Sequence, residues 1–416
     1  MKKNKFMVKN YKQKIKEWLY VYVLPEFDCF MALRAVKKLN INRKRNDTSI
    51  KVGFIVQMPE VWDKEAPVYE LMMEDKQFDP WLIVIPSYNA TSKSLNAYGR
   101  ELLFFQNKYQ FANILTSRQL HEDFSGLKAQ GFDYIFYQRC WESYLPDLLH
   151  TSKVIKYAKT CYIPYGFHFF NESLTYYKTR FFNSLYMFYC SNQQQFERYS
   201  SITKLKAAYL GFPGLCRTPN RSILRQNELR ILWTPRWETS LRYGGSTFYD
   251  YKDCFVTLKQ NSPYYKIVMR PHPLTFRHAI QTGKMSRNEI DEYIKKNKQA
   301  GIIFDENEDI KDTVEKTDVM ITDFSSVIIS ALLCGVVIIY TGKKTDETPN
   351  VILQQVLDCC YHANNWDDVI SILDAIKNNN DPLCEQRVIL AEMIRKEHAN
   401  SDKAILMSII RDYYSR

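Results

Sequence analysis

Several common signatures are missing from the chain. Its ten cysteines are scattered with no CxxC pair, which argues against a disulfide framework or a zinc site. No apolar run reaches the ~20 residues needed to span a bilayer. No RNA-recognition, zinc-finger or basic-zipper pattern occurs, and the N-terminus lacks the apolar stretch of a signal peptide. We therefore expect a cytoplasmic protein with reduced cysteines that does not bind nucleic acid.

The composition indicates a folded protein with an anionic partner. The 416 residues are too many for one compact core and suit two domains. The formal net charge of +11 favours a nucleotide, a phosphate polymer or a membrane surface as partner. Residues 1–18 carry seven lysines and run into aromatic residues. This segment either lies on the inner face of an anionic membrane or is a solvated terminus before a first helix.

Short apolar runs alternate with helical patterns, as in parallel sheets covered by helices on both faces. Strands are predicted at 51–56, 81–86, 134–137, 161–164, 230–234, 266–270, 301–304, 318–322 and 336–340. The breaker cluster that ends at Gly214 marks a boundary. We predict an α/β protein of two Rossmann-like, doubly wound domains that face a cleft. A basic segment and lead-in helix cover 1–50, one domain covers 51–212, and the other covers 213–416 and ends in helices.

The sharpest motif is Asp318-Val-Met-Ile-Thr-Asp-Phe-Ser-Ser326, in which a buried strand runs into a polar turn and then an apolar helix. Ser325 is suited to cap that helix. The two hydroxyls and the unpaired amides at the helix start would cradle a diphosphate. An ordinary capping turn between strand and helix would have the same sequence.

Two more polar segments follow predicted strands. One is Arg270-Pro-His-Pro273, in which the prolines stiffen the backbone around His272 beside the cation of Arg270. The other is Trp233-Thr-Pro-Arg-Trp237, where Arg236 could reach a phosphate. Taken alone, His272 is better explained as a residue that fills a turn, and the Arg236 segment is also explained as a surface loop held by tryptophan packing.

In order and spacing, the three motifs together resemble the carboxyl-terminal domain of the CDP-glycerol glycerophosphotransferases of cell-surface polymer synthesis. That family is similar to GT-B proteins and carries Thr-Asp-Tyr-Ser-Ser near its end and His-Pro upstream. Here these segments are Thr322-Asp-Phe-Ser-Ser326 and His272-Pro273. The resemblance covers residues 230–345.

The resemblance implies roles for individual residues. Ser325 and Ser326 would hold the donor diphosphate, and Thr322 and Asp323 would shape the pocket. Arg270 and His272 would stabilise the charge of the diphosphate as CMP leaves, and Arg236 is a further candidate for binding the donor. The partners would be a CDP-activated donor and a glycan or lipid-linked acceptor. Protein cations would replace a metal cofactor, and the sequence shows no convincing Asp-x-Asp motif.

The first domain departs from the family, because its usual Trp-His-Gly-Thr segment is absent. We expect His168, in the turn after the 161–164 strand, to take the proton from the acceptor hydroxyl. Packing of this histidine among Phe167, Phe169 and Phe170 is the alternative. Arg139 and Glu142, after another strand, either line the acceptor side or support the fold.

Two other functions remain open at this stage. A GT-B glycosyltransferase of capsule or lipooligosaccharide synthesis would use the same pocket for a nucleotide sugar. A nucleotide-binding scaffold in a glycan-assembly complex would bind without turnover. The sequence names neither the acceptor nor the group transferred.

Overall fold

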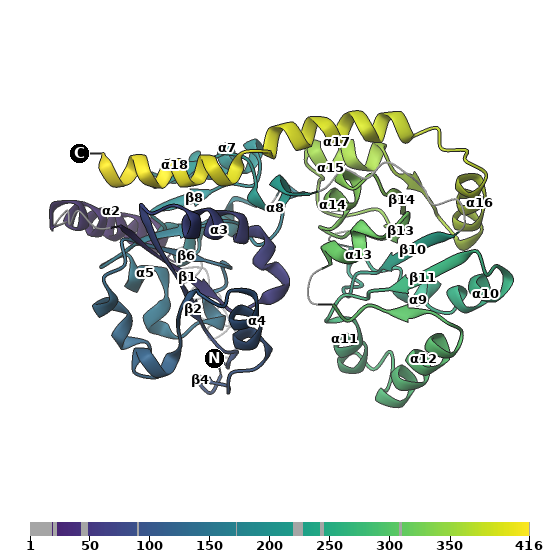
Figure 1. Ribbon diagram of the computed structural model, residues 1–416, viewed down its shortest axis with the longest axis horizontal. Coiled ribbons are helices and arrows are strands. Elements are labelled where there is room, and N and C mark those ends of the chain that lie inside the picture. The colour runs from purple at the N-terminus through teal and green to yellow at the C-terminus, as the bar shows by residue number, and fades with distance from the viewer. Residues whose placement is uncertain are drawn as a thin grey trace, which may run out of the picture. The chain divides into compact units, whose positions relative to one another are not determined.

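The computed structural model describes residues 19, 23–42, 49–89, 91–171, 173–218, 228–241, 245–307 and 310–415. The chain divides into two compact units. Unit 1 comprises residues up to Phe167, Glu172–Cys216 and Asn400–Arg416, and unit 2 comprises His168–Asn171 and Arg217–Ala399. Each unit contains its own parallel sheet with helices packed on it (Figure 1). The predicted α/β architecture with two Rossmann-like domains is therefore confirmed.

Unit 1 has a seven-stranded sheet in its described part, in the order β5-β2-β1-β6-β7-β8-β9. Every pairing within this sheet is parallel. Its strands are β1 (Ile50–Val56), β2 (Phe78–Val84), β5 (Asn113–Leu115), β6 (Tyr134–Tyr137), β7 (Lys159–Tyr162), β8 (Met187–Tyr189) and β9 (Lys206–Ala208). A short hairpin, β3 (Tyr88–Asn89) and β4 (Ser94–Leu95), stands apart.

The helices of unit 1 include one from the far end of the chain. They are α2 (Leu24–Asn42), α3 (Ala66–Glu74), α4 (Arg100–Lys108), α5 (Thr151–Val154), α6 (Arg180–Asn183), α7 (Gln193–Ser200), α8 (Pro213–Cys216) and α18 (Ser401–Tyr414). Helix α18 packs against α3 (Figure 1). Within the part of the chain that the structure describes, no helix has the length and apolar character to cross a membrane.

Unit 2 has a six-stranded sheet across its described residues, in the order β12-β11-β10-β13-β14-β15. All its pairings are parallel. The strands are β10 (Leu229–Thr234), β11 (Tyr265–Met269), β12 (Ile303–Phe304), β13 (Val319–Thr322), β14 (Val337–Tyr340) and β15 (Tyr361–His362). In chain order this is 3-2-1-4-5-6, the arrangement of dinucleotide-binding folds.

Helices cover this second sheet and enclose its apolar core. They are α9 (Phe248–Tyr251), α10 (Cys254–Asn261), α11 (Thr275–Gln281), α12 (Arg287–Gln299), α13 (Lys311–Glu315), α14 (Ile328–Leu333), α15 (Val351–Asp358), α16 (Trp366–Lys377) and α17 (Cys384–His398). Trp233 of β10 is fully buried and stacks on Phe248 with ring centroids 5.7 Å apart. The apolar runs that predicted strands are thus explained by burial on both sheet faces.

The compact units differ from the predicted domains in three places. The division falls after Cys216 instead of Phe212, residues 168–171 join unit 2, and the last helix joins unit 1. Specific polar contacts account for the last difference. Asp412 of α18 accepts hydrogen bonds from Lys159 Nζ at 2.7 Å, Tyr134 Oη at 2.7 Å and Lys206 Nζ at 2.8 Å, all in unit 1. Such long-range pairing cannot be inferred from local sequence patterns.

Candidate functional site

The strand order of unit 2 reverses between β10 and β13, and the predicted motifs meet at this point. Thr234 ends β10 and lies opposite Thr322, which ends β13. The Thr322 hydroxyl lies 3.0 Å from the Thr234 carbonyl oxygen. In open parallel sheets, ligands bind beyond the carboxyl ends of strands at such a reversal. The turns after Thr234 and Thr322 are therefore where a ligand site is expected.

Asp323 joins these turns. One carboxylate oxygen accepts the Arg236 backbone N–H at 2.7 Å. The other accepts the Thr247 backbone N–H at 2.9 Å and the Thr247 hydroxyl at 3.2 Å. Asp323 is completely buried. A single side chain therefore fixes the loop after β10 and the start of α9 relative to the turn after β13.

The environment of Asp323 disfavours its negative charge. Burial raises the pKa of the carboxyl to about 6, although hydrogen bonds from Thr247 and Arg236 and the Arg236 charge act in the opposite direction. Because the side chain is buried and already accepts three hydrogen bonds, it positions the loops instead of presenting an oxygen to solvent. This geometry suits the predicted role of Thr322 and Asp323 in shaping a pocket.

The two serines occupy the turn between β13 and α14. Ser325 is partly buried and Ser326 is exposed. The prediction that Ser325 caps the helix is wrong, because α14 begins at Ile328 and the capping position belongs to Val327. The Ser325 hydroxyl instead accepts the Val327 backbone N–H at 3.4 Å. The Ser326 hydroxyl is left at the surface of the turn, where a ligand can reach it.

His272 lies in the turn after β11. Its Nδ1 accepts the Leu274 backbone N–H at 3.1 Å, so the neutral ring carries its proton on Nε2. Burial of part of the ring and the charge of Arg236 lower the pKa of His272 to about 4, although more than a third of the residue is exposed. The Trp237 ring centroid lies 6.2 Å away. At neutral pH this histidine is therefore a neutral hydrogen-bond donor and not a cation.

Arg270 and Arg236 are both engaged with carboxylates. Arg270 Nη1 lies 2.7 Å from Asp305 Oδ2, and the Thr313 hydroxyl donates to the same oxygen at 2.5 Å. Arg236 Nη2 lies 3.0 Å from Glu238 Oε2. These two pairs fix the guanidinium groups near the strand ends. They also reduce the positive charge that a ligand would meet, an effect that the sequence motifs alone did not reveal.

The turn at Phe324 contacts the segment that carries the predicted base. The Phe324 ring lies edge-on to Phe169 at 5.8 Å and to Phe170 at 4.7 Å between centroids. The Arg236 guanidinium lies 5.7 Å from the Phe324 ring centroid. Phe324 thus links Arg236 to the residues that follow His168.

His168 was predicted within the first domain, but it belongs to unit 2. Its carbonyl oxygen accepts from Asn350 Nδ2 at 2.7 Å, and the Asn350 backbone N–H donates to Phe169 at 2.8 Å. Phe170 forms an isolated antiparallel bridge with Pro349. These backbone contacts explain why the segment groups with unit 2. Within this unit, His168 directly precedes Phe169 and Phe170, whose rings contact Phe324 in the serine turn.

The strand order of unit 1 reverses between β1 and β6, and polar residues gather there too. Gln138 Oε1 accepts the backbone N–H groups of Gln57 and Met58, each at 2.8 Å. Arg139 donates to Gln57 Oε1 from Nε at 3.1 Å and from Nη2 at 2.6 Å. Glu142 instead accepts the backbone N–H of Thr151, the first residue of α5, at 2.7 Å. Glu142 therefore has a structural role, whereas Arg139 stays a candidate for the acceptor side.

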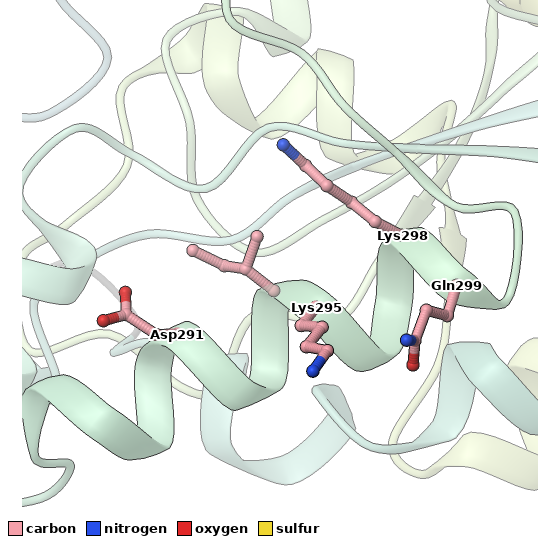
Figure 2. A pocket seen from close by; sticks show the side chains of 5 residues that line it. Asp291, Lys295, Lys298 and Gln299 are labelled. Atoms are coloured by element: carbon pink, nitrogen blue, oxygen red, sulfur yellow. The ribbon is translucent and has the colours of Figure 1, made fainter.

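A concavity of about 510 Å³ lies elsewhere, along α12. Figure 2 shows its labelled residues, Asp291, Lys295, Lys298 and Gln299, on one exposed helix. None of the predicted site residues lines it. Among the described residues, no cluster of three His, Cys, Asp or Glu side chains could hold a metal ion.

Sequence reasoning missed four contributors to the site. Asp305 and Thr247 lie outside the recognised motifs, and Phe324 and Trp237 within them seemed to be packing residues. The end of β12 could have indicated Asp305, since it directly follows a strand of the same parallel sheet. Nothing in the local sequence indicates that Thr247 reaches Asp323.

Solved structures share the fold. A UDP-GlcNAc 2-epimerase from Neisseria meningitidis bound to UDP-GlcNAc aligns with a TM-score of 0.57 at 10% identity, covering 87% of this chain and 100% of that one. The wall teichoic acid polymerase TagF aligns with a TM-score of 0.52 at 11% identity, covering 94% and 99%. A glycosyltransferase from Rickettsia africae gives 0.51 at 11%, covering 88% and 98%. At these identities the likeness establishes the GT-B-type fold alone.

Sequence comparison gives a more specific result for part of unit 2. No curated protein matches the chain. Residues 220–334 match the family described as CDP-Glycerol:Poly(glycerophosphate) glycerophosphotransferase. The matched segment contains β10, β11, β13 and α14, and with them the three motifs. The resemblance to the CDP-glycerol glycerophosphotransferases that these motifs indicated is thereby confirmed over residues 220–334.

Proposed function

We propose that the chain transfers an alditol phosphate of the glycerol phosphate type from a CDP-activated donor to a hydroxyl group. The acceptor is a cell-surface glycan, as a lipid-linked saccharide or a growing polymer. One observation carries the proposal. The family match covers the segment that contains β10 and β13, the paired strands between which the strand order of unit 2 reverses. The turns at Arg236, His272 and Ser326 follow three strands of this parallel sheet.

The proposed step is a displacement at phosphorus. The acceptor oxygen forms a bond to the β-phosphorus of the donor while the bond from that phosphorus to the bridging oxygen breaks. The bridging oxygen leaves with CMP, and the acceptor proton passes to His168. Such reactions depend mainly on positioning and on stabilising charge in the transition state.

The geometry indicates a different role for each residue that would contact the donor diphosphate. His272 would donate a hydrogen bond from Nε2 to a phosphate oxygen, because its Nδ1 is occupied by the Leu274 N–H. The Ser326 hydroxyl is exposed in its turn and would donate a second. Arg236 and Arg270, each already paired with a carboxylate, would contribute long-range positive charge. We propose that these groups bind the diphosphate without a metal cofactor.

A transfer assay tests this function. Purified protein is given CDP-glycerol, CDP-ribitol, UDP-sugars or CMP-sugars with a hydroxyl acceptor. Release of the nucleotide leaving group is measured, which is CMP from a CDP-alditol or a CMP-sugar and UDP from a UDP-sugar. Ser326→Ala and His272→Ala should each lower turnover with the CDP-alditol by about 100-fold, as expected for losing one preorganised donor. Ser371→Ala, an exposed serine on α16, is the matched control and should retain full turnover.

Two outcomes would overturn the assignment. Turnover with a UDP- or CMP-sugar alone would identify a glycosyltransferase. Near-normal turnover of CDP-glycerol in both the Ser326 and the His272 variants would remove these residues from the donor site.

The location follows from the acceptor in this proposal. A lipid-linked acceptor would place the reaction on the inner face of the cell membrane. The basic segment 1–18, for which contact with that surface was one of two interpretations, lies outside the described residues.

A further inference from the structure

The strand-order reversal of unit 1, between β1 and β6, carries side chains that the proposed donor site does not use. Gln57 follows β1, Arg139 and Trp141 follow β6, and Tyr165 follows β7. These three strands are neighbours in one parallel sheet, so the four residues come after adjacent carboxyl ends. Ligands of open parallel sheets bind in this position. Unit 1 therefore has a candidate ligand site of its own.

The backbone amides of the loop after β1 are hydrogen-bonded within unit 1. Gln138 is buried, and its Oε1 accepts the N–H groups of Gln57 and Met58, each at 2.8 Å. Its Nε2 donates to the Met58 carbonyl oxygen at 2.8 Å. Amides in such a turn hold the phosphates of nucleotides. Since these two are already engaged, the loop after β1 does not suit a diphosphate.

Arg139 supplies a positive charge at this reversal point. It donates to Gln57 Oε1 from Nε at 3.1 Å and from Nη2 at 2.6 Å, and to the Met58 sulfur from Nη1 at 3.4 Å. These acceptors are neutral, whereas the two arginines of the proposed donor site are each paired with a carboxylate. Burial lowers the pKa of Arg139, and the Tyr144 and Tyr165 hydroxyls oppose that effect. The charge that a guanidinium retains at neutral pH is thus available to an anionic ligand.

Aromatic side chains with exposed surface lie beside this guanidinium. The Tyr144 ring centroid is 4.4 Å from Arg139 Cζ. The exposed fractions are 42% for Trp141, 49% for Tyr144 and 37% for Tyr165. The Tyr144 N–H donates to the Trp141 carbonyl oxygen at 3.2 Å, so a tight turn keeps these two residues together. A partly exposed aromatic ring offers a flat apolar face, to which the C–H groups of a pyranose ring are complementary.

Gln57 fixes the position of Arg139. Besides accepting from the guanidinium, its side-chain amide donates to the carbonyl oxygens of Pro86 at 3.2 Å and Tyr144 at 3.0 Å. This one side chain therefore joins the segments that follow β1, β2 and β6. A site whose side chains are held in place before binding loses less conformational entropy when the ligand binds.

The combination of groups distinguishes between ligand classes. A poly(glycerol phosphate) chain has negative charge but no ring for Trp141 and Tyr144. A neutral saccharide has the ring but leaves Arg139 without an anion. A nucleoside diphosphate has both, but the amides that would hold its phosphates are engaged by Gln138. A saccharide with one anionic group satisfies the guanidinium and the aromatic rings together.

We propose that the turns after β1, β6 and β7 bind an anionic saccharide. Arg139 pairs with its phosphate or carboxylate group, Trp141, Tyr144 and Tyr165 contact its pyranose ring, and Gln57 is a positioning residue. This inference rests on the proposed function, because the saccharide is the acceptor whose hydroxyl receives the transferred group. It narrows the acceptor to a glycan that contains an acidic or phosphorylated sugar.

Ligand-observed NMR titration of the full-length chain, without a CDP-linked donor, tests the proposal. The probes are glucose 1-phosphate, glucuronic acid, methyl glucoside and glycerol 1-phosphate, and each dissociation constant is measured. At least one of the two anionic pyranoses should bind about tenfold more tightly than methyl glucoside, as expected for one charge-assisted pair. It should exceed glycerol 1-phosphate by a similar factor, because that phosphate has no ring. Comparison of the first two probes shows whether the anion is a phosphate or a carboxylate.

Two variants and two matched controls assign the binding to named side chains. Arg139→Gln should weaken binding of the preferred anionic pyranose at least about tenfold and leave methyl glucoside unchanged. Trp141→Ala should weaken binding of both pyranoses at least about threefold and leave glycerol 1-phosphate unchanged. Arg118→Gln and Phe111→Ala, which replace an exposed arginine and an exposed phenylalanine elsewhere in unit 1, should bind as wild type does.

Circular dichroism checks that each variant is folded. If Arg139→Gln does not fold, the wild-type probe series and Trp141→Ala decide the question. The proposal is overturned if neither anionic pyranose binds, or if methyl glucoside or glycerol 1-phosphate binds as tightly as they do. A folded Arg139→Gln or Trp141→Ala variant that binds them as wild type does would also overturn it.

Failure of this site and failure of the proposed function give different results. Binding of an anionic pyranose by a protein that transfers nothing from a CDP-alditol would keep the saccharide site and remove the donor assignment. Transfer from a CDP-alditol by a protein that binds neither anionic pyranose would remove the saccharide site alone.

Discussion

Replacement of Asp323 by asparagine tests the idea that a buried carboxyl holds the loops of the donor site. The change keeps the shape of the side chain and removes its titration. In the native protein, burial raises the pKa of Asp323 from 3.8 to about 6. That difference of about 2 units corresponds to about 3 kcal/mol between the two protonation states.

The direction of the pH effect follows from the raised pKa. Between pH 4 and pH 6 the unfolded state releases this proton while the native state retains it. The contribution of Asp323 to stability is therefore complete below pH 4 and is lost as the pH rises through 6. Asp323→Asn should lack this change. Its free energy of unfolding relative to wild type should therefore rise by about 3 kcal/mol from pH 4 to pH 7.

At pH 4 the variant should be within about 1 kcal/mol of wild type. The native carboxyl is protonated at this pH, so its O–H, like the amide NH₂ group of the variant, faces the Arg236 or the Thr247 N–H. Urea unfolding followed by hydrogen exchange of the β10 and β13 peptides measures unit 2 specifically. A difference between variant and wild type that stays constant from pH 4 to pH 7 would refute the reasoning.

Three other predictions concern separate features. Asp412→Asn should destabilise unit 1 by about 3–5 kcal/mol, because it leaves the buried Lys159 ammonium without its carboxylate; urea unfolding of the β7 and α18 peptides measures this. Hydrogen bonds from Lys159, Lys206 and tyrosines hold the pKa of Asp412 below its usual range despite burial, so wild type, but not this variant, should lose that stability as the pH falls below about 4. Phe324→Ala should lower turnover more than donor affinity, since it removes the ring contacts to Phe169 and Phe170; kcat and KM measured separately show the split, and an equal loss in both would contradict it. Treatment with EDTA followed by dialysis should leave turnover of the CDP-alditol unchanged, and loss that magnesium restores would show that the proposed metal-free site is wrong.

The sequence predicts the fold well where burial produces a local signal. The core strands at 134–137 and 230–234 are β-branched or aromatic runs buried on both faces of a parallel sheet, and both appear as β6 and as most of β10. The short edge strand β9 (Lys206–Ala208) was missed, because its three residues include no β-branched or aromatic side chain and it is defined by pairing with β8. Pairing is a tertiary property that no short window contains.

The sequence indicated which strand ends form the candidate site, but it did not indicate which residues contact one another there. Motifs at the ends of β10 and β13 indicated Arg236 and Asp323 because parallel strands bring such turns together. The partners of these residues come from distant positions. Thr247 lies 76 residues from Asp323, and Asp305 lies 35 residues from Arg270. The grouping of His168 with unit 2 likewise depends on Asn350, 182 residues away.

Calorimetric titration with CDP, UDP, CMP and GDP, in the absence of metal, tests the central claim most directly. The claim is that unit 2 binds a CDP-linked donor at the Ser326 turn. The account predicts clear preference for CDP, with affinity weakened in Ser326→Ala and unchanged in Ser371→Ala. Preference for UDP, or no binding of any of the four nucleotides, would contradict it.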